Sequence, residues 1–317
     1  MKWELWEEIE RAQKRIRKVI FQTPMIYSDA ISKMAGKEVF LKLENLQKTG
    51  SFKIRGAYYK LSQLNPSMRK QGVVAASAGN HAQGVAYASS LLGIRSTIVM
   101  PEGASIAKQM ATRSYGGEVI LFGQDMDESL RYVRQLEEKG SYFVHPFDDE
   151  QVIAGQGTIG LEILEEVPGV EAIVVPIGGG GLISGIATIV KKRRPEVKIV
   201  GVQAAHAPSA FYSWKKKKIV EADVQPTLAD GIALRRIGER TFPVIERKVD
   251  DIILVEEDEI ASAILILMER KRVVAEGAGA TPLAALLSRP GRIRILICQN
   301  SCSDQRFLRI TLENPRR

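Results

Sequence analysis

The chain has 317 residues, 45% of them apolar, so it can bury a substantial core as one large domain or, as we favour, two of ordinary size. Its net charge of +8 includes basic runs at 191–194 and 215–218, but no aromatic side chains alternate with them, which argues against nucleic-acid binding and for a solvated surface. A charged beginning and the lack of any long apolar run argue against a signal peptide or membrane span, so we expect a cytoplasmic protein.

The first predicted element is an amphipathic helix. Leu5, Ile9, Ala12, Ile16 and Val19 follow one another in steps of four and three, which places one apolar stripe on an otherwise charged helix. This stripe predicts packing against the rest of the protein rather than a chemical role.

Beyond this helix, short β-rich runs alternate with helical segments. The predicted strands are 39–43, 73–76, 97–100, 119–122, 142–144, 173–175, 199–202, 252–255 and 293–297. The helices predicted between them include 82–92, 182–192 and 260–271. Such alternation indicates right-handed crossovers, and therefore an α/β fold with parallel sheets flanked by helices.

The tripeptide Ser51-Phe52-Lys53 is the first candidate for chemistry. A lysine taken alone is a solvated charge. An amine in a confined site, however, can become a usable base and can bind an aldehyde as a Schiff base. Lys53 is therefore of interest only if other parts of such a site occur in the chain.

The segment Ser77-Ala78-Gly79-Asn80-His81 follows a predicted strand and opens a predicted helix. Backbone N–H groups converge at such a point, with the helix dipole behind them, and can bind an anion. The alternative is an ordinary strand-to-helix turn in which Asn80 caps the helix.

Four glycines, Gly178, Gly179, Gly180 and Gly181, also lie between a predicted strand and a predicted helix. Without side chains, their amides can approach a phosphate closely. A dinucleotide fingerprint fits poorly, because Ile183 or Ser184 takes the place of its last glycine and Gln203 replaces the ribose-binding acid. An amine, an anion loop and a phosphate cradle together favour pyridoxal 5'-phosphate as cofactor.

Several motifs in the same order carry a family resemblance. They run from Lys42-Leu43-Glu44-Asn45, through 154–158 and 229–231, to Glu276-Gly277-Ala278-Gly279, and so cover nearly all of the chain. The sequence resembles the catabolic threonine and serine dehydratases, relatives of serine racemase among the fold type II (tryptophan synthase beta-like) pyridoxal phosphate enzymes. This resemblance implies a small domain, 57–146, inserted into a large domain, 1–56 and 147–317, with the active site in the cleft between them.

The resemblance also implies roles for individual residues. Lys53 would be the catalytic Schiff-base lysine, with Phe52 and Gly231 on opposite faces of the cofactor ring and Glu276 near it. The remaining cofactor contacts would be Asn80 to the phenolic oxygen, Gly178 to Gly181 to the phosphate, and Cys298 to the pyridine nitrogen. The substrate carboxylate would lie in the loop formed by Ser77, Ala78, Gly79, Asn80 and His81, with His81 a structural contributor rather than a proton shuttle.

The implied activity is α,β-elimination of L-threonine, and of L-serine, to a 2-oxo acid and ammonia. Serine racemase is an alternative, but Ala78 replaces the serine that would supply its second proton. The acidic metal ligand of those relatives is also missing, since residues 203–206 read Gln-Ala-Ala-His. No metal is expected, because neither the histidines nor the cysteines have ligand spacing, and Cys298 and Cys302 are expected as free thiols. A non-enzymatic cofactor-binding sensor or scaffold is a further alternative, and a homodimer or homotetramer is expected by resemblance.

The resemblance breaks near the end of the chain. The family pattern is a strand followed by Ser-Gly-Gly-Asn, whereas this chain reads Ile297-Cys298-Gln299-Asn300-Ser301 and ends in a basic tail, 314–317. Cys298 can serve as a neutral partner of the ring nitrogen, but the glycines of the turn are absent. One hypothesis is an altered terminus that impairs activity. The stretch after Arg292 is also short for a regulatory domain, which predicts a short, catabolic-type member.

Overall fold

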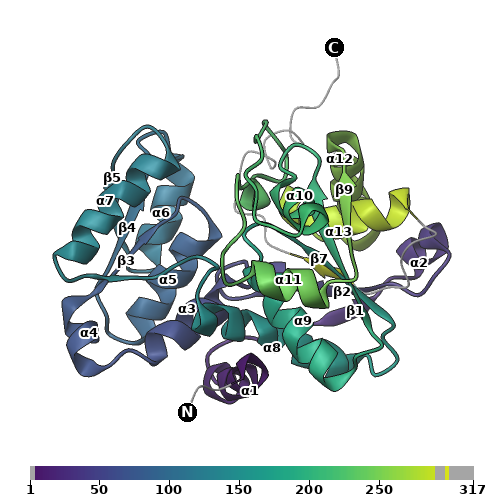
Figure 1. Ribbon diagram of the computed structural model, residues 1–317, viewed down its shortest axis with the longest axis horizontal. Coiled ribbons are helices and arrows are strands. Elements are labelled where there is room, and N and C mark those ends of the chain that lie inside the picture. Colours follow the sequence, from purple (N-terminus) through teal and green to yellow (C-terminus); the bar gives the residue numbers. More distant parts are fainter. Residues whose placement is uncertain (1–3, 290–296, 300–317) are drawn as a thin grey trace.

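The computed structural model describes residues 4–289 and the backbone of 297–299, which form two parallel-stranded lobes (Figure 1). The larger sheet has six strands in the order β1-β2-β10-β7-β8-β9. They are β1 (Met25–Tyr27), β2 (Phe40–Leu43), β10 (Ile297–Gln299), β7 (Ala172–Pro176), β8 (Lys198–Ala204) and β9 (Asp251–Val255). Every neighbouring pair is parallel except β1 with β2. The predicted α/β class is confirmed, although the antiparallel edge strand β1 was not among the predicted strands.

The smaller sheet has four strands in the order β5-β4-β3-β6, all parallel. They are β3 (Val73–Ala76), β4 (Ser96–Met100), β5 (Glu118–Leu121) and β6 (Tyr142–Phe143). All four lie inside the segment 57–146, which we keep as the proposed inserted domain. The small sheet therefore comes from one continuous stretch of chain, whereas the large sheet is assembled from both sides of it.

Alternating residues of the strands divide each sheet into two apolar faces. In β7, Ile173 and Val175 belong to one core, and Val174 belongs to another on the opposite face. The first core is closed by α1 (Leu5–Ile16), α8 (Glu150–Glu166), α9 (Gly181–Arg193), α10 (Ser209–Lys216) and α11 (Phe242–Lys248). The second is closed by α2 (Asp29–Ala35), α12 (Glu257–Ile266) and α13 (Gly277–Ser288). Because successive strand residues point to opposite faces, both faces of the large sheet are apolar, and helices cover each of them.

The small sheet follows the same rule. Val73 and Ala75 pack with the helices α3 (Lys53–Ser62) and α5 (Asn80–Leu91), while Val74 packs on the other face with Val133 of α7 (Met126–Glu138). Two further helices, α4 (Pro66–Gln71) and α6 (Ile106–Ser114), complete this lobe. Among residues 4–289, no helix combines the length and apolarity needed to cross a bilayer.

Local sequence signals explain several helix starts. Ser28, Asn65, Ser105, Asp125 and Asp149 each stand just before a helix and accept a hydrogen bond from a backbone N–H of its first turn. The predicted helix 260–271 is observed as α12 followed by the π-helical turn η3 (Leu267–Lys271). The final predicted strand, 293–297, is described only as β10, three residues that begin at Ile297.

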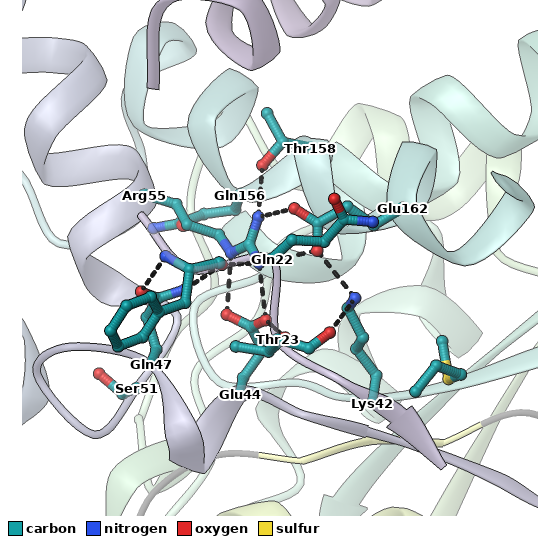
Figure 2. Close-up of polar contacts among 12 residues, drawn as sticks. Gln22, Thr23, Lys42, Glu44, Gln47, Ser51, Arg55, Gln156, Thr158 and Glu162 are labelled. Atoms are coloured by element: carbon teal, nitrogen blue, oxygen red, sulfur yellow. Dashed lines mark hydrogen bonds and ion pairs between the residues drawn. The ribbon is translucent and has the colours of Figure 1, made fainter. Parts of the chain in front are cut away.

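A buried charge network joins the segment before residue 57 to helix α8, which follows the small sheet in the sequence (Figure 2). The Arg55 guanidinium is fully buried and donates to both carboxylate oxygens of Glu44, at 2.8 Å each, and of Glu162, at 2.6 and 2.9 Å. Lys42, also fully buried, lies 2.8 Å from Glu162 and from Glu166. These groups come from β2, the short helix η1 (Glu44–Leu46), α3 and α8. Since Arg55 is two residues beyond Lys53, the network holds the first turn of α3 in place.

We predict that Arg55→Met destabilises the protein strongly, because it leaves two buried carboxylates with Lys42 as the remaining cation. Breaking such a buried pair costs about 3–5 kcal/mol in free energy of unfolding, measurable by urea denaturation. The matched control is Arg193→Ala, which removes an exposed pair with Glu10 and should cost about 0–1 kcal/mol. If Arg55→Met does not accumulate as folded protein, Arg55→Lys, which keeps the charge but not the fork, should give an intermediate loss. An effect of either variant no larger than that of the control would contradict the network's role.

Candidate active site

A cavity of about 350 Å³ lies between the two lobes. It is lined by Phe52, Lys53, Ser77, Ala78, Gly79, Asn80, His81, Gly178, Gly179, Gly180, Gly181, Gly231 and Glu276. The structure thus brings together the residues singled out in the sequence, with one exception. That exception, Cys298, lies in β10, whose backbone pairs with β2 and β7, but its side chain is outside the described residues.

Lys53 is the first residue of α3, and its amine donates a hydrogen bond of 2.9 Å to the Pro146 carbonyl. The amine also lies 5.3 Å from the centroid of the Phe52 ring, which is itself buried. Burial lowers the pKa of Lys53 to about 8, against a smaller opposing effect of Glu276. About a tenth of the amine is therefore unprotonated at pH 7 and about half at pH 8, so it is available as a nucleophile or base.

The loop from Ser77 to His81 connects β3 to α5. The Gly79 N–H donates to the Ser77 hydroxyl at 3.2 Å, and Asn80 starts the helix, whose N-terminus faces the cavity. The His81 Nε2–H donates to the Val144 carbonyl at 2.9 Å, and burial lowers the pKa of His81 to about 3. A neutral, backbone-bonded imidazole is the arrangement expected of a structural residue. The loop offers backbone donors and a helix N-terminus to an anion.

The four glycines form a tight turn between β7 and α9. Gly180 has φ of +95°, which favours glycine. An added Cβ on Gly179 would lie 2.3 Å from the Phe147 ring, and one on Gly181 would lie 2.9 Å from the Phe147 carbonyl. The turn is therefore a cradle in which any Cβ would fill space or collide, and it stands at the N-terminus of a long helix. Its size and donors suit a phosphate group.

Glu276 immediately precedes α13 and faces the cavity from the large lobe. The Asn80 amide donates to both its carboxylate oxygens, at 3.0 and 3.2 Å. Burial raises the pKa of Glu276 to about 8, although the Asn80 hydrogen bond acts in the opposite direction. Gly231, in the short helix η2 (Asp230–Ile232), lies beside this carboxylate: a Cβ there would be 3.5 Å from Oε1.

Sequence reasoning missed several residues of the cavity wall, notably Phe147 and Gln156. The Phe147 ring is held edge-on by His145, with centroids 4.7 Å apart, and covers Gly179. Gln156 is buried; its oxygen accepts from the Gly56 N–H at 3.1 Å, and its Nε2 has no partner among the described residues. The signal for Phe147 was its place in the loop that follows the parallel strand β6, since ligands bind at the carboxyl ends of such strands.

Gln203 stands where the resemblance would place an acidic metal ligand, and its side chain forms structural hydrogen bonds instead. Gln203 is fully buried in β8, donates to the Ile177 carbonyl at 3.2 Å and accepts from the Phe211 N–H at 2.9 Å. No group of three or more histidine, cysteine or acidic side chains with metal-binding geometry occurs in the part of the chain that the structure describes.

Comparisons with known proteins agree with this interpretation of the site. The family profile of pyridoxal-phosphate dependent enzymes matches residues 16–296. An L-threonine ammonia-lyase of Thermotoga maritima is 52% identical over 284 residues, which are 89% of this chain and 71% of that protein. A catabolic L-threonine dehydratase of Staphylococcus aureus is 49% identical over 283 residues, 89% of this chain and 82% of that protein.

Solved structures give the same picture. Maize serine racemase superposes with a TM-score of 0.93 at 35% identity, covering 96% of each chain. The processed form of threonine deaminase isoform 2 from Solanum lycopersicum superposes with a TM-score of 0.92 at 35% identity, covering 97% of this chain and 91% of that one.

We predict a pH-dependent gain in stability for Lys53→Met in the cofactor-free protein. The unfolded lysine keeps its proton up to about pH 10.5, but the folded one releases it near pH 8, so its charge destabilises the folded state fully below pH 8. Removing it should raise the free energy of unfolding at pH 7 by up to about 3 kcal/mol. This gain should fade as the pH approaches 10.5. Lys33→Met, at an exposed site, is the control; an equal gain for Lys53→Met at the two ends of this pH range would contradict the assignment.

We further predict that Gly179→Ala lowers affinity for pyridoxal phosphate at least about tenfold and destabilises the fold by about 1–3 kcal/mol, because the new Cβ overlaps the Phe147 ring. Visible absorbance titration and thermal denaturation measure the two effects. Gly103→Ala is the control, because a Cβ there meets nothing within 4 Å. Adding Phe147→Ala should recover part of the lost stability. A Gly179→Ala protein that binds and melts like the wild type would refute the cradle.

Proposed function

The chain belongs to the family of pyridoxal-phosphate dependent enzymes, and on that premise we propose that it is an L-threonine ammonia-lyase. It would convert L-threonine to 2-oxobutyrate and ammonia, and L-serine to pyruvate and ammonia. The observation that carries the proposal is the placement of the Lys53 amine in one cavity with two anion-binding loops, Ser77 to His81 and Gly178 to Gly181. Close identity to threonine ammonia-lyases supports the choice of substrate.

The residues present fit the cofactor. The glycine cradle would hold its phosphate, Lys53 its aldehyde carbon and Asn80 its phenolic oxygen, with Phe52 and Gly231 beside the ring and Cys298 at the pyridine nitrogen. The buried Nε2 of Gln156, which has no partner within residues 4–289, is a further donor in the cavity wall. When bound, pyridoxal phosphate supplies an electron sink for the electrons of the substrate Cα–H bond.

The protein's own residues supply orientation and proton transfer. The loop from Ser77 to His81 binds the substrate carboxylate through backbone N–H groups and so fixes the direction of the Cα–H bond. The Lys53 amine, with its pKa lowered to about 8, removes the α-proton and then carries it on Nζ. The apolar residues of the wall, including Phe52, Phe147 and Leu182, limit water at this amine.

Residue 78 distinguishes the proposed elimination from racemisation. A racemase needs a second proton donor on the opposite side of the substrate from Lys53, and Ala78 has no proton to give. This favours elimination. A cofactor-binding protein without activity would share the cavity but would not need a lysine whose pKa is matched to proton transfer.

We also propose a cytoplasmic homodimer or homotetramer, with a small domain at 57–146. Exposed apolar side chains near η1 support self-association: Phe21, Leu46 and Val274 are each more than half exposed, and Asn45 bonds the Val274 carbonyl.

The test adds L-threonine to purified protein with pyridoxal phosphate and follows 2-oxobutyrate, with Lys53→Ala alongside. We expect a visible cofactor band and oxo-acid production, and we expect Lys53→Ala to lose at least about 10²-fold of the rate. A band with D-serine formed from L-serine but no oxo acid would identify a racemase. A band without any product would support the non-enzymatic alternative, and no band would overturn the cofactor assignment.

A further inference from the structure

One pair of side chains, Asn80 and Glu276, forms hydrogen bonds between the two helices that open onto the cavity from opposite lobes. Asn80 is the first residue of α5 in the small lobe, and Glu276 directly precedes α13 in the large lobe. The Asn80 Nδ2 group lies 3.0 and 3.2 Å from the two carboxylate oxygens of Glu276, although the residues are 196 positions apart in sequence.

Glu276 is a buried carboxyl group rather than a solvated surface acid. It lies beside Gly231, where an added Cβ would be 3.5 Å from Oε1, and the charged groups that influence it are Asp230, Lys108 and Lys53. Among the described residues, Asn80 donates the side-chain hydrogen bonds to its oxygens. The carboxyl group accepts from Asn80 in either protonation state, because a protonated carboxyl keeps a carbonyl oxygen.

A carboxamide has two nearly isosteric orientations, which exchange its donor and acceptor ends. An ionised carboxylate on one side only accepts hydrogen bonds, so it selects the orientation in which Nδ2 faces it. A protonated carboxyl selects this orientation less strongly, because its O–H can donate to Oδ1. The same Nδ2 carries two hydrogens, so one bond to Glu276 is compatible with a second, donated to the phenolic oxygen of the cofactor. In the reversed orientation, Oδ1 would face the oxygens of Glu276 and the donor would be lost.

We propose that Glu276 is a positioning residue: it acts through Asn80, by holding the carboxamide in the orientation that donates to the cofactor's phenolic oxygen. This inference rests on the proposed function only for the identity of the cofactor. It differs from a direct role of Glu276 on the ring or on the substrate, which would require its carboxyl group to touch those groups or to exchange a proton with them.

The bond also makes the position of Asn80 depend on how the lobes sit together. Asn80 lies in the small lobe and Glu276 in the large one, so their hydrogen bond crosses the cleft between the two helix N-termini. The ion pair between Lys108 of α6 and Asp230 of η2, at 3.5 Å, crosses the same cleft.

The test is a double-variant cycle on Glu276→Ala and Asn80→Ala, read by titration of the cofactor-free protein with pyridoxal phosphate and by the position of its visible band. No substrate is added. Each single variant should weaken binding by about 10- to 100-fold, the effect of one hydrogen bond to a charged group, and should shift the band in the same direction. The double variant should be no weaker than Asn80→Ala alone, because both changes remove one interaction.

Glu276→Gln tests the same selection more finely, because its amide oxygen can still accept from Asn80 but its Nε2 group can also donate to a reversed Asn80 Oδ1. We expect its binding and band to lie between those of wild type and those of Glu276→Ala. If Glu276→Gln is as damaged as Glu276→Ala, or if the two alanine effects add, the inference is wrong. Glu196→Gln, which removes an exposed acid, controls for charge, and thermal denaturation checks that each variant is folded.

The same proteins are then assayed with L-threonine. A wild type that binds cofactor and shows the expected cycle but no turnover would contradict the proposed activity and leave the role of Glu276 standing. A wild type that turns over but shows additive effects would support the activity and overturn the role of Glu276.

Discussion

The buried guanidinium of Arg55 is the interaction on which the active-site architecture depends. It lies between two carboxylates from different parts of the chain, Glu44 beside β2 and Glu162 on α8. The helix that carries it approaches α8 so closely that a Cβ on Gly155 would stand 2.5 Å from Gly56. Charge pairing and backbone contact thus fix one turn of α3, and Lys53 is the first residue of that turn. The Lys53 amine is held by a rigid helix end rather than by a loop.

Much of the fold and most of the site residues could be predicted because their signals are local. Buried parallel strands are continuous apolar runs, and the glycines at 178–181 mark the tight turn after one of them. Parallel strands also place their carboxyl ends along one edge of a sheet, so loops after separate strands meet there. The family resemblance predicted that these loops surround one cavity, and the structure places them there.

The remaining features depend on contacts that no local pattern encodes. Phe147, in the loop between β6 and α8, covers the glycine cradle only through a tertiary contact with Gly179, and Glu276 meets Asn80 only because the lobes pack together. The strand β1 is three residues long and half-exposed, which is too little for an apolar pattern. The sequence alone shows that residue 203 is a glutamine and not an acidic metal ligand. Only the structure shows its hydrogen bonds to Ile177 and Phe211, which explain why a buried amide suits that place.

The position of β10 has a consequence for how the chain acquires its structure. This strand, residues 297–299, lies between β2 and β7 in the middle of the large sheet. During synthesis, β2 and β7 therefore have no partner between them until nearly 300 residues have left the ribosome. The small sheet, made entirely from residues 73–143, has no such requirement. Its contacts have shorter sequence separation, so it can form before the larger sheet is complete.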